Sequence, residues 1–507
     1  MIRITTHNNQ VMYQAYHLVK AFYPDQEVIQ DRTTLHQDNK LQEPYVTIQF
    51  DGSCFSISET LSKEETTRNI YRYLSQRSGK ELPWGILTGV RPTKLFYEQT
   101  GKQANLIDYM CDRYFISQEK AELCVQVIQQ EHKILSDLSL NEGVSFYIGI
   151  PFCPSICSYC SFGSMCIQGQ ERLVEQYLSA LMYEIEQKVR NNQKQVHTIY
   201  IGGGTPTSLS AGHMNQLLSH ICQVIPMKDV IEFTVEAGRP DTITREKLEI
   251  LRNYPVTRIA INPQSMNQNT LDRIGRSHTA EDVTRAFHLA RELGFDSINM
   301  DLIVGLGETV EEFKHTLSEI GKLQPDGITI HSLAIKRASQ IAGNRNKSGS
   351  NAQVALVCKG DHKVHHKVLS ESIETQATAQ AHHVFEHTFN EELDYTQADK
   401  NITQQIEEML RLAGTFVRGM QMQPYYLYRQ KNIAGNFENV GYAKVDKAGR
   451  YNILIMEDKQ TILACGAAAV TKYVLPEKVI YKDRLTHIIR ESNPKDVREY
   501  IKRMMNM

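Results

Sequence analysis

The chain has 507 residues and carries 56 Lys and Arg against 58 Asp and Glu, so its formal net charge is −2. A near-neutral chain is a poor candidate for a protein that binds nucleic acid or a membrane surface through charge, and we expect neither partner. An apolar fraction of 41% is ordinary for a globular protein, and the length is enough for about three domains.

No apolar run reaches the roughly 20 residues that a membrane-spanning helix needs. The N-terminal stretch MIRITTHNNQ holds no apolar segment of the kind found in signal peptides. We therefore expect a cytoplasmic protein without membrane insertion. In that compartment its ten cysteines are thiols or metal ligands rather than disulfides.

Residues 1–138 predict a small α/β domain followed by a helical connector. The segments RITTHN, YVTIQF and SCFSISE have the apolar and β-branched content of strands. Apolar residues at helical spacing predict helices over 11–22 and 63–78, the second with Thr60 or Ser62 as its N-cap.

Residues 139–335 alternate short apolar runs with amphipathic segments, which is typical of parallel βα units. The right-handed crossover rule then predicts an α/β fold in which the sheet curls into a partial (β/α)6 barrel. The predicted strands are VSFYIGI, HTIYIGG, VIEFTVEA, TRIAIN, DSINMDLIVG and DGITIHSL, and the predicted helices cover 171–189, 214–225, 245–253, 282–293 and 310–322.

Residues 336–400 break this order and predict a divergent, flexible insertion, because NRNKSGSNAQ is polar and rich in small residues. Six of the 18 histidines lie between His362 and His387, and a metal or haem role is the alternative. Residues 401–507 predict a covering, substrate-binding domain with a helix over 402–417, a strand at YNILIM and a final charged helix.

The main chemical signal is three clustered cysteines, Cys153, Cys157 and Cys160, directly after the predicted strand YIGIP. Loops at the carboxyl ends of barrel strands are where such folds place their active sites. Three thiolates at C-x3-C-x2-C spacing can bind three irons of a [4Fe–4S] cluster and leave the fourth iron open. Zinc is the alternative, with Cys166 as the fourth ligand.

Polar or glycine residues also stand at the ends of the following strands. The run GGGTPT ends the second strand, where glycines allow a ligand to approach the backbone closely; a phosphate loop is a weaker interpretation, because no Gly-Lys-Ser/Thr follows. Glu236 ends the third strand, Gln264 follows the fourth and Asp301 lies on the fifth. This repetition favours a site rather than a core.

The cysteine spacing, with Tyr159 before the third cysteine, resembles the radical S-adenosylmethionine (SAM) superfamily over residues 144–335. That resemblance implies a [4Fe–4S] cluster whose open iron chelates SAM. It also implies reductive cleavage of SAM to a 5′-deoxyadenosyl radical, with electrons from a low-potential donor such as flavodoxin or ferredoxin.

A finer resemblance rests on YIGIPFC, GGGTPT, VEAGRPDTI, INPQSMNQNTLDRIGRSHT, NMDLIVGLGET and PYYLYRQKNIAGNFENVGYAK. These phrases resemble the oxygen-independent coproporphyrinogen III oxidases and, over nearly the whole chain, their HemZ branch, the coproporphyrinogen dehydrogenases. Arg276 would then pair with a carboxylate. The resemblance implies cluster ligation by Cys153, Cys157 and Cys160, and cofactor contacts from Tyr147, Phe162, Gly203, Gly204, Thr205, Glu236, Gln264, Arg276 and Asp301.

The implied reaction is anaerobic oxidative decarboxylation of two propionates of coproporphyrinogen III to vinyls, which yields protoporphyrinogen IX. Tyr425, Tyr426, Tyr428, Arg429 and Lys431 would stack on the tetrapyrrole and pair with its propionates. Ordinary packing of these tyrosines and an RNA-binding patch are the alternatives.

Three departures from the oxidases keep other functions open. Phe162 stands where the oxidases have a fourth cysteine, Gly149 stands where they have a histidine, and their N-terminal Arg-Tyr-Thr-Ser-Tyr-Pro stretch has no counterpart. The Cys-Ser-Phe ending resembles haem chaperones of the same superfamily. A chaperone without turnover and a haem-modifying radical SAM enzyme are therefore the alternative functions.

Overall fold

The computed structural model describes residues 1–24, 26–31, 45–58, 61–161, 163–333, 395–430, 437–482 and 484–506. Phe162, Lys431 and the histidine-rich stretch 362–387 lie outside the described residues. The predictions made for them, including the flexible insertion, stay predictions.

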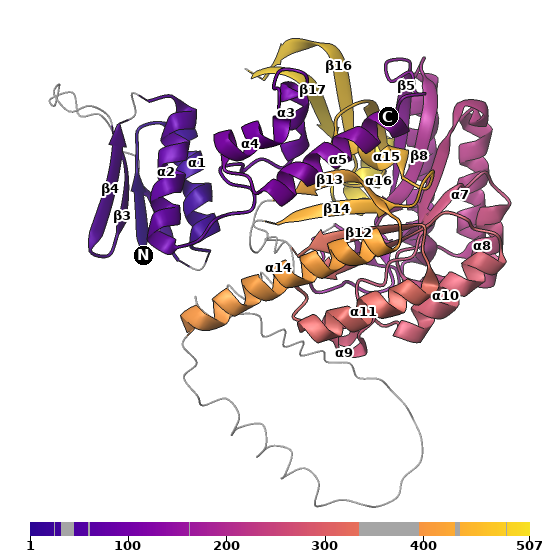
Figure 1. The fold of residues 1–507 in the computed structure, drawn as a ribbon. Helices are drawn as coiled ribbons and strands as arrows, with labels where there is room; N and C mark the ends of the chain where they lie inside the picture. The colour runs from indigo at the N-terminus through magenta and orange to yellow at the C-terminus, as the bar shows by residue number, and fades with distance from the viewer. Residues whose placement is uncertain are drawn as a thin grey trace, which may run out of the picture.

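The N-terminal segment forms a small sheet with strand order β2-β1-β3-β4, and helices α1 and α2 pack against it (Figure 1). Apolar residues of sheet and helices share one core, as Ile4, Ile48, Leu18 and Leu74 illustrate. Ser62, one of the two residues predicted as N-cap, is the N-cap of α2 and forms a reciprocal capping box with Glu65. The elements are β1 (Ile2–Thr5), α1 (Asn9–Phe22), β2 (Val28–Asp31), β3 (Tyr45–Phe50), β4 (Ser53–Ser58) and α2 (Lys63–Ser78).

The helical connector joins the N-terminal segment to strands near the C-terminus. Trp84 is fully buried and its Nε1 donates to Glu438 Oε2 at 2.8 Å. Around it, α3 (Pro92–Gln99), α4 (Leu106–Tyr114) and α5 (Gln118–Ile134) share a core with Leu427 and Val440. The connector therefore braces the strands that carry those two residues.

The predicted α/β order of the central region is confirmed as a large, unclosed sheet that forms a partial barrel. The six parallel strands are neighbours in chain order, and their helices line the outer side of the sheet (Figure 1). The strands are β5 (Gly143–Ile150), β8 (Gln195–Gly203), β9 (Glu232–Glu236), β10 (Arg258–Ala260), β11 (Ile298–Val304) and β12 (Gly327–Ser332). The helices are α6 (Glu171–Arg190), α7 (Ala211–Val224), α8 (Arg245–Arg252), α9 (Gln268–Arg273), α10 (Ala280–Glu292) and α11 (Val310–Leu323).

Strands from the C-terminal region extend this same sheet at both ends. At one end β14 pairs antiparallel with β12, and at the other β15 lies parallel to β5. Within the described residues the order is β13-β14-β12-β11-β10-β9-β8-β5-β15-β16-β17. The elements are α14 (Tyr395–Gly419), β13 (Gln423–Arg429), β14 (Glu438–Ala443), α15 (Arg450–Met456), β15 (Thr461–Cys465), β16 (Val470–Tyr481), β17 (Arg484–Ser492) and α16 (Val497–Met505).

The strand predicted at YNILIM is wrong, because these residues form helix α15. A short apolar run satisfies either a strand or a buried helix, and packing decides between them. Here Tyr451, Ile453 and Leu454 are buried, and the last two join a core with Tyr425 and Tyr426 of β13. The division of the chain at 138, 335 and 400 stays a prediction. No helix among the described residues has the length and apolarity to cross a bilayer.

Candidate active site

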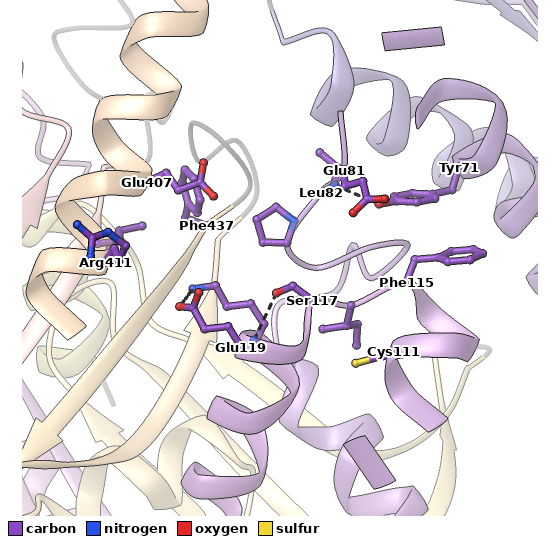
Figure 2. A pocket seen from close by; sticks show the side chains of 14 residues that line it. Tyr71, Glu81, Leu82, Cys111, Phe115, Ser117, Glu119, Glu407, Arg411 and Phe437 are labelled. Atoms are coloured by element: carbon purple, nitrogen blue, oxygen red, sulfur yellow. Dashed lines mark hydrogen bonds and ion pairs between the residues drawn. The ribbon is translucent and has the colours of Figure 1, made fainter. Parts of the chain in front are cut away.

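A cavity of about 490 Å³ lies between the connector and α14 (Figure 2), and none of the predicted site residues lines it. It has acidic and basic walls, but its two cations already have carboxylate partners. Lys120 Nζ lies 2.8 Å from Glu438 Oε1, and Arg411 Nη2 lies 2.6 Å from Glu408 Oε1. With its charges paired in this way, the cavity favours no particular ligand.

A second cavity, of about 400 Å³, opens at the carboxyl ends of the parallel strands and gathers most of the predicted site residues. Tyr147 instead lines an adjoining cavity of about 270 Å³, together with Gly203 and Gly204. Phe162 lies outside the described residues. The predicted residues that line the larger cavity are Cys153, Cys157, Cys160, Gly203, Gly204, Thr205, Glu236, Gln264, Arg276 and Asp301.

The cysteine loop leaves β5 and is fastened to its neighbours. Cys153 Sγ lies 3.5 Å from Thr205 Oγ1, and Cys157 is 8% exposed. Cys166 is exposed and its thiol donates to the Pro154 carbonyl at 3.2 Å. Across the described residues, no three Cys, His, Asp or Glu side chains converge closely enough to hold a metal ion as they stand.

Glycines beside the cysteines leave room that a side chain would fill. A Cβ on Gly204 would lie 2.6 Å from the Phe152 carbonyl oxygen and 3.0 Å from Cys153 Sγ. Gly203 has φ +108°, a conformation that L-residues with side chains rarely adopt. A bound group can thus reach the backbone next to three soft thiol donors, which fits a cluster with an organic ligand.

Glu236 ends β9 and is held by its neighbours rather than by a cation. Tyr200 donates to Glu236 Oε1 at 2.5 Å, and the Gly203 N–H also donates to this carboxylate. Burial is the main cause that raises the pKa of Glu236 to about 7, with the charge of Asp301 adding to it. A cationic ligand beside Glu236 would favour its ionised form.

The raised pKa of Glu236 predicts a pH-dependent stability difference. The native state keeps this proton between about pH 4.5 and 7 while the unfolded state releases it, so Glu236 lowers stability as pH rises through that window. We expect the free energy of unfolding of Glu236→Gln to be higher than that of the native protein. The difference should grow between about pH 5 and 7 and reach at most about 3 kcal/mol. Denaturant titration at each pH measures it, and a margin independent of pH would contradict it.

Asp301 lies on β11 in a network that stabilises its charge. Burial alone would raise its pKa, but the polar groups of His331, Thr329 and Asn299 around it hold the pKa below its usual range. Asn299 Nδ2 donates to Asp301 Oδ1 at 2.8 Å, and His331 Nε2 lies 3.6 Å from Oδ2. The cavity therefore contains one carboxylate that stays ionised and one, Glu236, that is about half protonated at pH 7.

Two further predicted residues present polar atoms that have no partner among the described residues. Gln264 has φ +67° and a buried Oε1 that accepts no hydrogen bond. Arg276 is 7% exposed; its Nη1 donates to the Asn262 carbonyl at 2.6 Å, while its Nε is buried without a partner. Because such groups are costly to leave unpaired, they are suited to meeting a bound polar ligand. No protein carboxylate pairs with Arg276 among its described hydrogen bonds.

The cavity also has an aromatic part. Tyr426 and Tyr428 line it with nearly parallel rings, and Tyr428 Oη lies 3.3 Å from His331 Nδ1. Tyr425 is buried outside the cavity lining, and Arg429 is buried with Nη1 donating to the Leu87 carbonyl at 2.7 Å. Of the predicted aromatic and cationic run, two tyrosines therefore face the site, and Arg429 braces the connector instead.

Sequence reasoning missed His331 and Arg239, which both line the cavity. A signal existed for each. His331 interrupts the apolar run of β12, and Arg239 lies three residues after the strand end at Glu236 in the phrase VEAGRPDTI. Charged or titratable residues inside or just after apolar strands are expensive unless a site uses them.

Comparison with known proteins agrees with this geometry. The Radical SAM superfamily model matches residues 147–320, so the barrel and its cysteine loop are those of a radical SAM protein. The oxygen-independent coproporphyrinogen-III oxidase-like protein HemZ of Bacillus subtilis is 38% identical over 451 residues, covering 87% of this chain and 78% of the relative. The chain belongs to this oxygen-independent coproporphyrinogen-III oxidase-like family.

Two other similarities place the chain among its neighbours. The haem chaperone HemW of Bacillus subtilis is 40% identical over 195 residues, which are 38% of this chain and 51% of that protein. The coproporphyrinogen III oxidase HemN of Escherichia coli shares the fold, with a TM-score of 0.50 at 19% identity over 76% of this chain and 73% of that one. As a radical SAM protein, the chain binds a [4Fe–4S] cluster and SAM.

Proposed function

We propose that the protein is a radical SAM oxidoreductase that converts propionates of coproporphyrinogen III to vinyls without oxygen. The observation that carries the proposal is that one cavity is lined both by the cysteine loop with its glycine cradle and by Tyr426, Tyr428 and His331. The cysteine loop and glycines suit the cofactors, and the other three side chains offer flat rings and a ring-nitrogen donor to a macrocycle that carries carboxylates. A low-potential electron donor would dock outside.

The cluster and SAM, when bound, supply the one-electron chemistry that removes a hydrogen atom from a propionate. Cys153, Cys157 and Cys160 would hold the cluster. Asp301 and Glu236 would orient the polar groups of SAM, and the buried Gln264 oxygen would accept a hydrogen bond from it. The chain supplies position and exclusion of water, since loss of carbon dioxide and one further electron to an acceptor requires no protein nucleophile.

The proposed SAM contacts predict weaker binding when Asp301 is shortened. Asp301→Ala removes a carboxylate held in a partly buried polar network, so we expect SAM affinity to fall about tenfold to a hundredfold, about 1–3 kcal/mol, while iron content stays unchanged. Equilibrium binding to the reconstituted protein measures this. Asp296→Ala is the matched control, because Asp296 is 83% exposed just before the same strand. Equal SAM affinity in both variants would remove Asp301 from the site.

The proposed reaction predicts a fixed product ratio. Each vinyl requires removal of one hydrogen atom, so two vinyls consume two SAM molecules per porphyrinogen. We expect anaerobic incubation with coproporphyrinogen III, SAM and a strong reductant to give protoporphyrin, after oxidation, and 5′-deoxyadenosine near one to two. A three-propionate intermediate is expected at early times. Liquid chromatography with mass detection quantifies all three.

The similarity to haem chaperones supplies the second candidate function. A chaperone would bind haem stoichiometrically and form 5′-deoxyadenosine only at a background rate. A haem-modifying enzyme would instead consume haem together with SAM. The same incubation with haem in place of the porphyrinogen therefore separates the three functions.

A further inference from the structure

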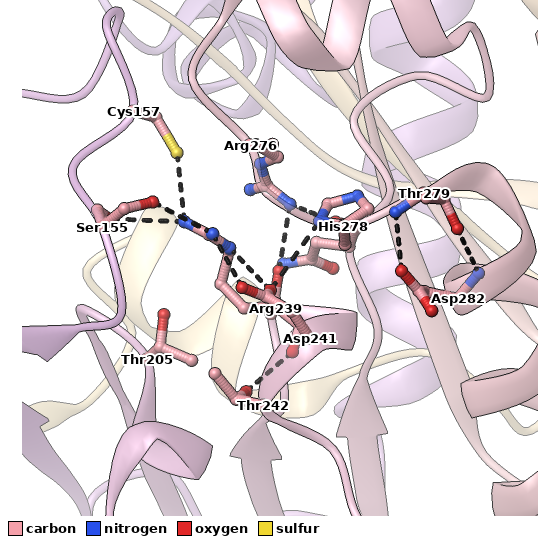
Figure 3. A network of polar contacts seen from close by, with 12 residues as sticks. Ser155, Cys157, Thr205, Arg239, Asp241, Thr242, Arg276, His278, Thr279 and Asp282 are labelled. Carbon is pink, nitrogen blue, oxygen red and sulfur yellow. Dashed lines mark hydrogen bonds and ion pairs between the residues drawn. The ribbon is translucent and has the colours of Figure 1, made fainter. Parts of the chain in front are cut away.

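Arg239 fastens the cysteine loop at its middle cysteine. Its side chain is 3% exposed and lies between the loop and the end of β9 (Figure 3). Nη1 donates to the Ser155 carbonyl at 3.2 Å and lies 3.8 Å from Cys157 Sγ, while Nη2 donates to Ser155 Oγ at 3.1 Å. One guanidinium thus contacts both the backbone of the loop and a predicted cluster ligand.

The guanidinium is itself fixed by a carboxylate. Arg239 Nε donates to Asp241 Oδ1 and Nη2 to Asp241 Oδ2, each at 3.0 Å. This bidentate pairing leaves Nη1 directed at the loop (Figure 3). Asp241 lies two residues after Arg239 in the short turn Pro240–Thr242, so the pair is built by local sequence.

The charged groups around Cys157 carry more positive than negative charge. The positive charge of Arg276 also acts on Cys157, so two buried guanidinium groups lie near this sulfur. His278 is fully buried, and burial together with Arg276 lowers its pKa to about 3, so this imidazole is neutral near pH 7. Asp241 is the carboxylate paired with Arg239, and it offsets one of the two positive charges.

We propose that Arg239 is a positioning residue that clamps the cysteine loop and, through an N–H···S contact to Cys157, raises the reduction potential of the cluster. Hydrogen bonds and positive charge at a ligand sulfur stabilise the reduced cluster, which carries one more negative charge. Reduction is the step for which a low-potential donor must supply an electron. The inference concerns the cluster alone and holds whichever tetrapyrrole is the substrate.

The test compares the reduction midpoint of the cluster in Arg239→Met and in the unaltered protein. After anaerobic reconstitution, iron content, circular dichroism and a redox titration followed by electron paramagnetic resonance are measured. We expect Arg239→Met to lower the midpoint potential by about 59 mV. For a one-electron couple this shift means that, at the midpoint potential of the unaltered protein, the ratio of reduced to oxidised cluster falls about tenfold. Arg239→Lys keeps the charge but not the fork and is expected to fall between the two.

Two further variants fix the interpretation. Arg245→Met removes a half-exposed arginine of nearby α8 and should leave the midpoint unchanged. Asp241→Asn removes the offsetting negative charge and should move the midpoint upward, opposite to Arg239→Met. If Arg239→Met folds but does not retain iron, that result supports the role of Arg239 as a clamp. In that case, and also if Arg239→Met does not fold, the effect on the reduction potential is measured in Arg239→Lys and Asp241→Asn. Full iron content with native midpoints in the Arg239 and Asp241 variants overturns the proposal.

Discussion

Cys157→Ala is expected to abolish the iron–sulfur cluster. Cys157 is the most buried of the three clustered cysteines; Arg239 directs an N–H donor at its sulfur, and Arg276 adds a second positive charge nearby. Loss of one of only three protein thiolates leaves two irons of the cube without ligands, which a cluster with an open iron cannot sustain. Anaerobically reconstituted protein should fall from about four irons per chain to near zero, with loss of the broad visible absorption that dithionite bleaches.

Cys166→Ala is the matched control for this loss. Cys166 is close in sequence, but it is exposed, and its thiol already donates to the Pro154 carbonyl. We expect its removal to leave iron content and absorption unchanged, whereas a zinc site with four cysteines would lose its metal in either variant. Iron lost from Cys166→Ala would mean that the ligand set contains a fourth cysteine.

Much of the barrel could be predicted from local sequence because its pattern is local. Each parallel strand is a short run buried on both faces, and each helix shows apolar residues at three and four, so α6 (Glu171–Arg190) matches its predicted range within one residue at its end. The parallel pairing of β15 with β5 could not be predicted in this way. It joins segments more than 300 residues apart, and nothing in the run from Thr461 to Cys465 specifies its neighbour.

In the candidate site too, the types of the functional residues could be predicted from the sequence, but their contacts in space could not. Chemically distinctive residues at strand ends, such as Glu236 and the clustered cysteines, could be recognised from the sequence, and the structure brings them to one cavity. Their individual roles toward SAM and the cluster stay predictions. The Arg239–Asp241 pair escaped notice because its meaning depends on the loop that it touches, more than 80 residues earlier in the chain. Tyr147 was predicted beside the others, but β5 directs it to the adjoining cavity.

Gly204→Ala is expected to disrupt both the cysteine loop and SAM binding. An added Cβ would meet the Phe152 carbonyl oxygen at 2.6 Å, the Ile150 carbonyl oxygen at 2.9 Å and Cys153 Sγ at 3.0 Å. The two carbonyls belong to backbone that already accepts hydrogen bonds from Gly204 and Thr205 at 2.7 Å, so it cannot yield without breaking them. We expect a stability loss of about 1–3 kcal/mol, and a fall in SAM affinity of at least about tenfold.

Gly212→Ala separates this steric effect from the general consequence of replacing glycine. Gly212 lies in the first turn of α7, and a Cβ there meets nothing within 4 Å. Alanine in a helix is favoured over glycine by about 0.5–1 kcal/mol, so we expect unchanged or slightly higher stability and native SAM affinity. Thermal melting and equilibrium SAM binding on both variants measure the contrast. If Gly204→Ala binds SAM as tightly as Gly212→Ala, the loop after β8 is not the cradle of the cofactor.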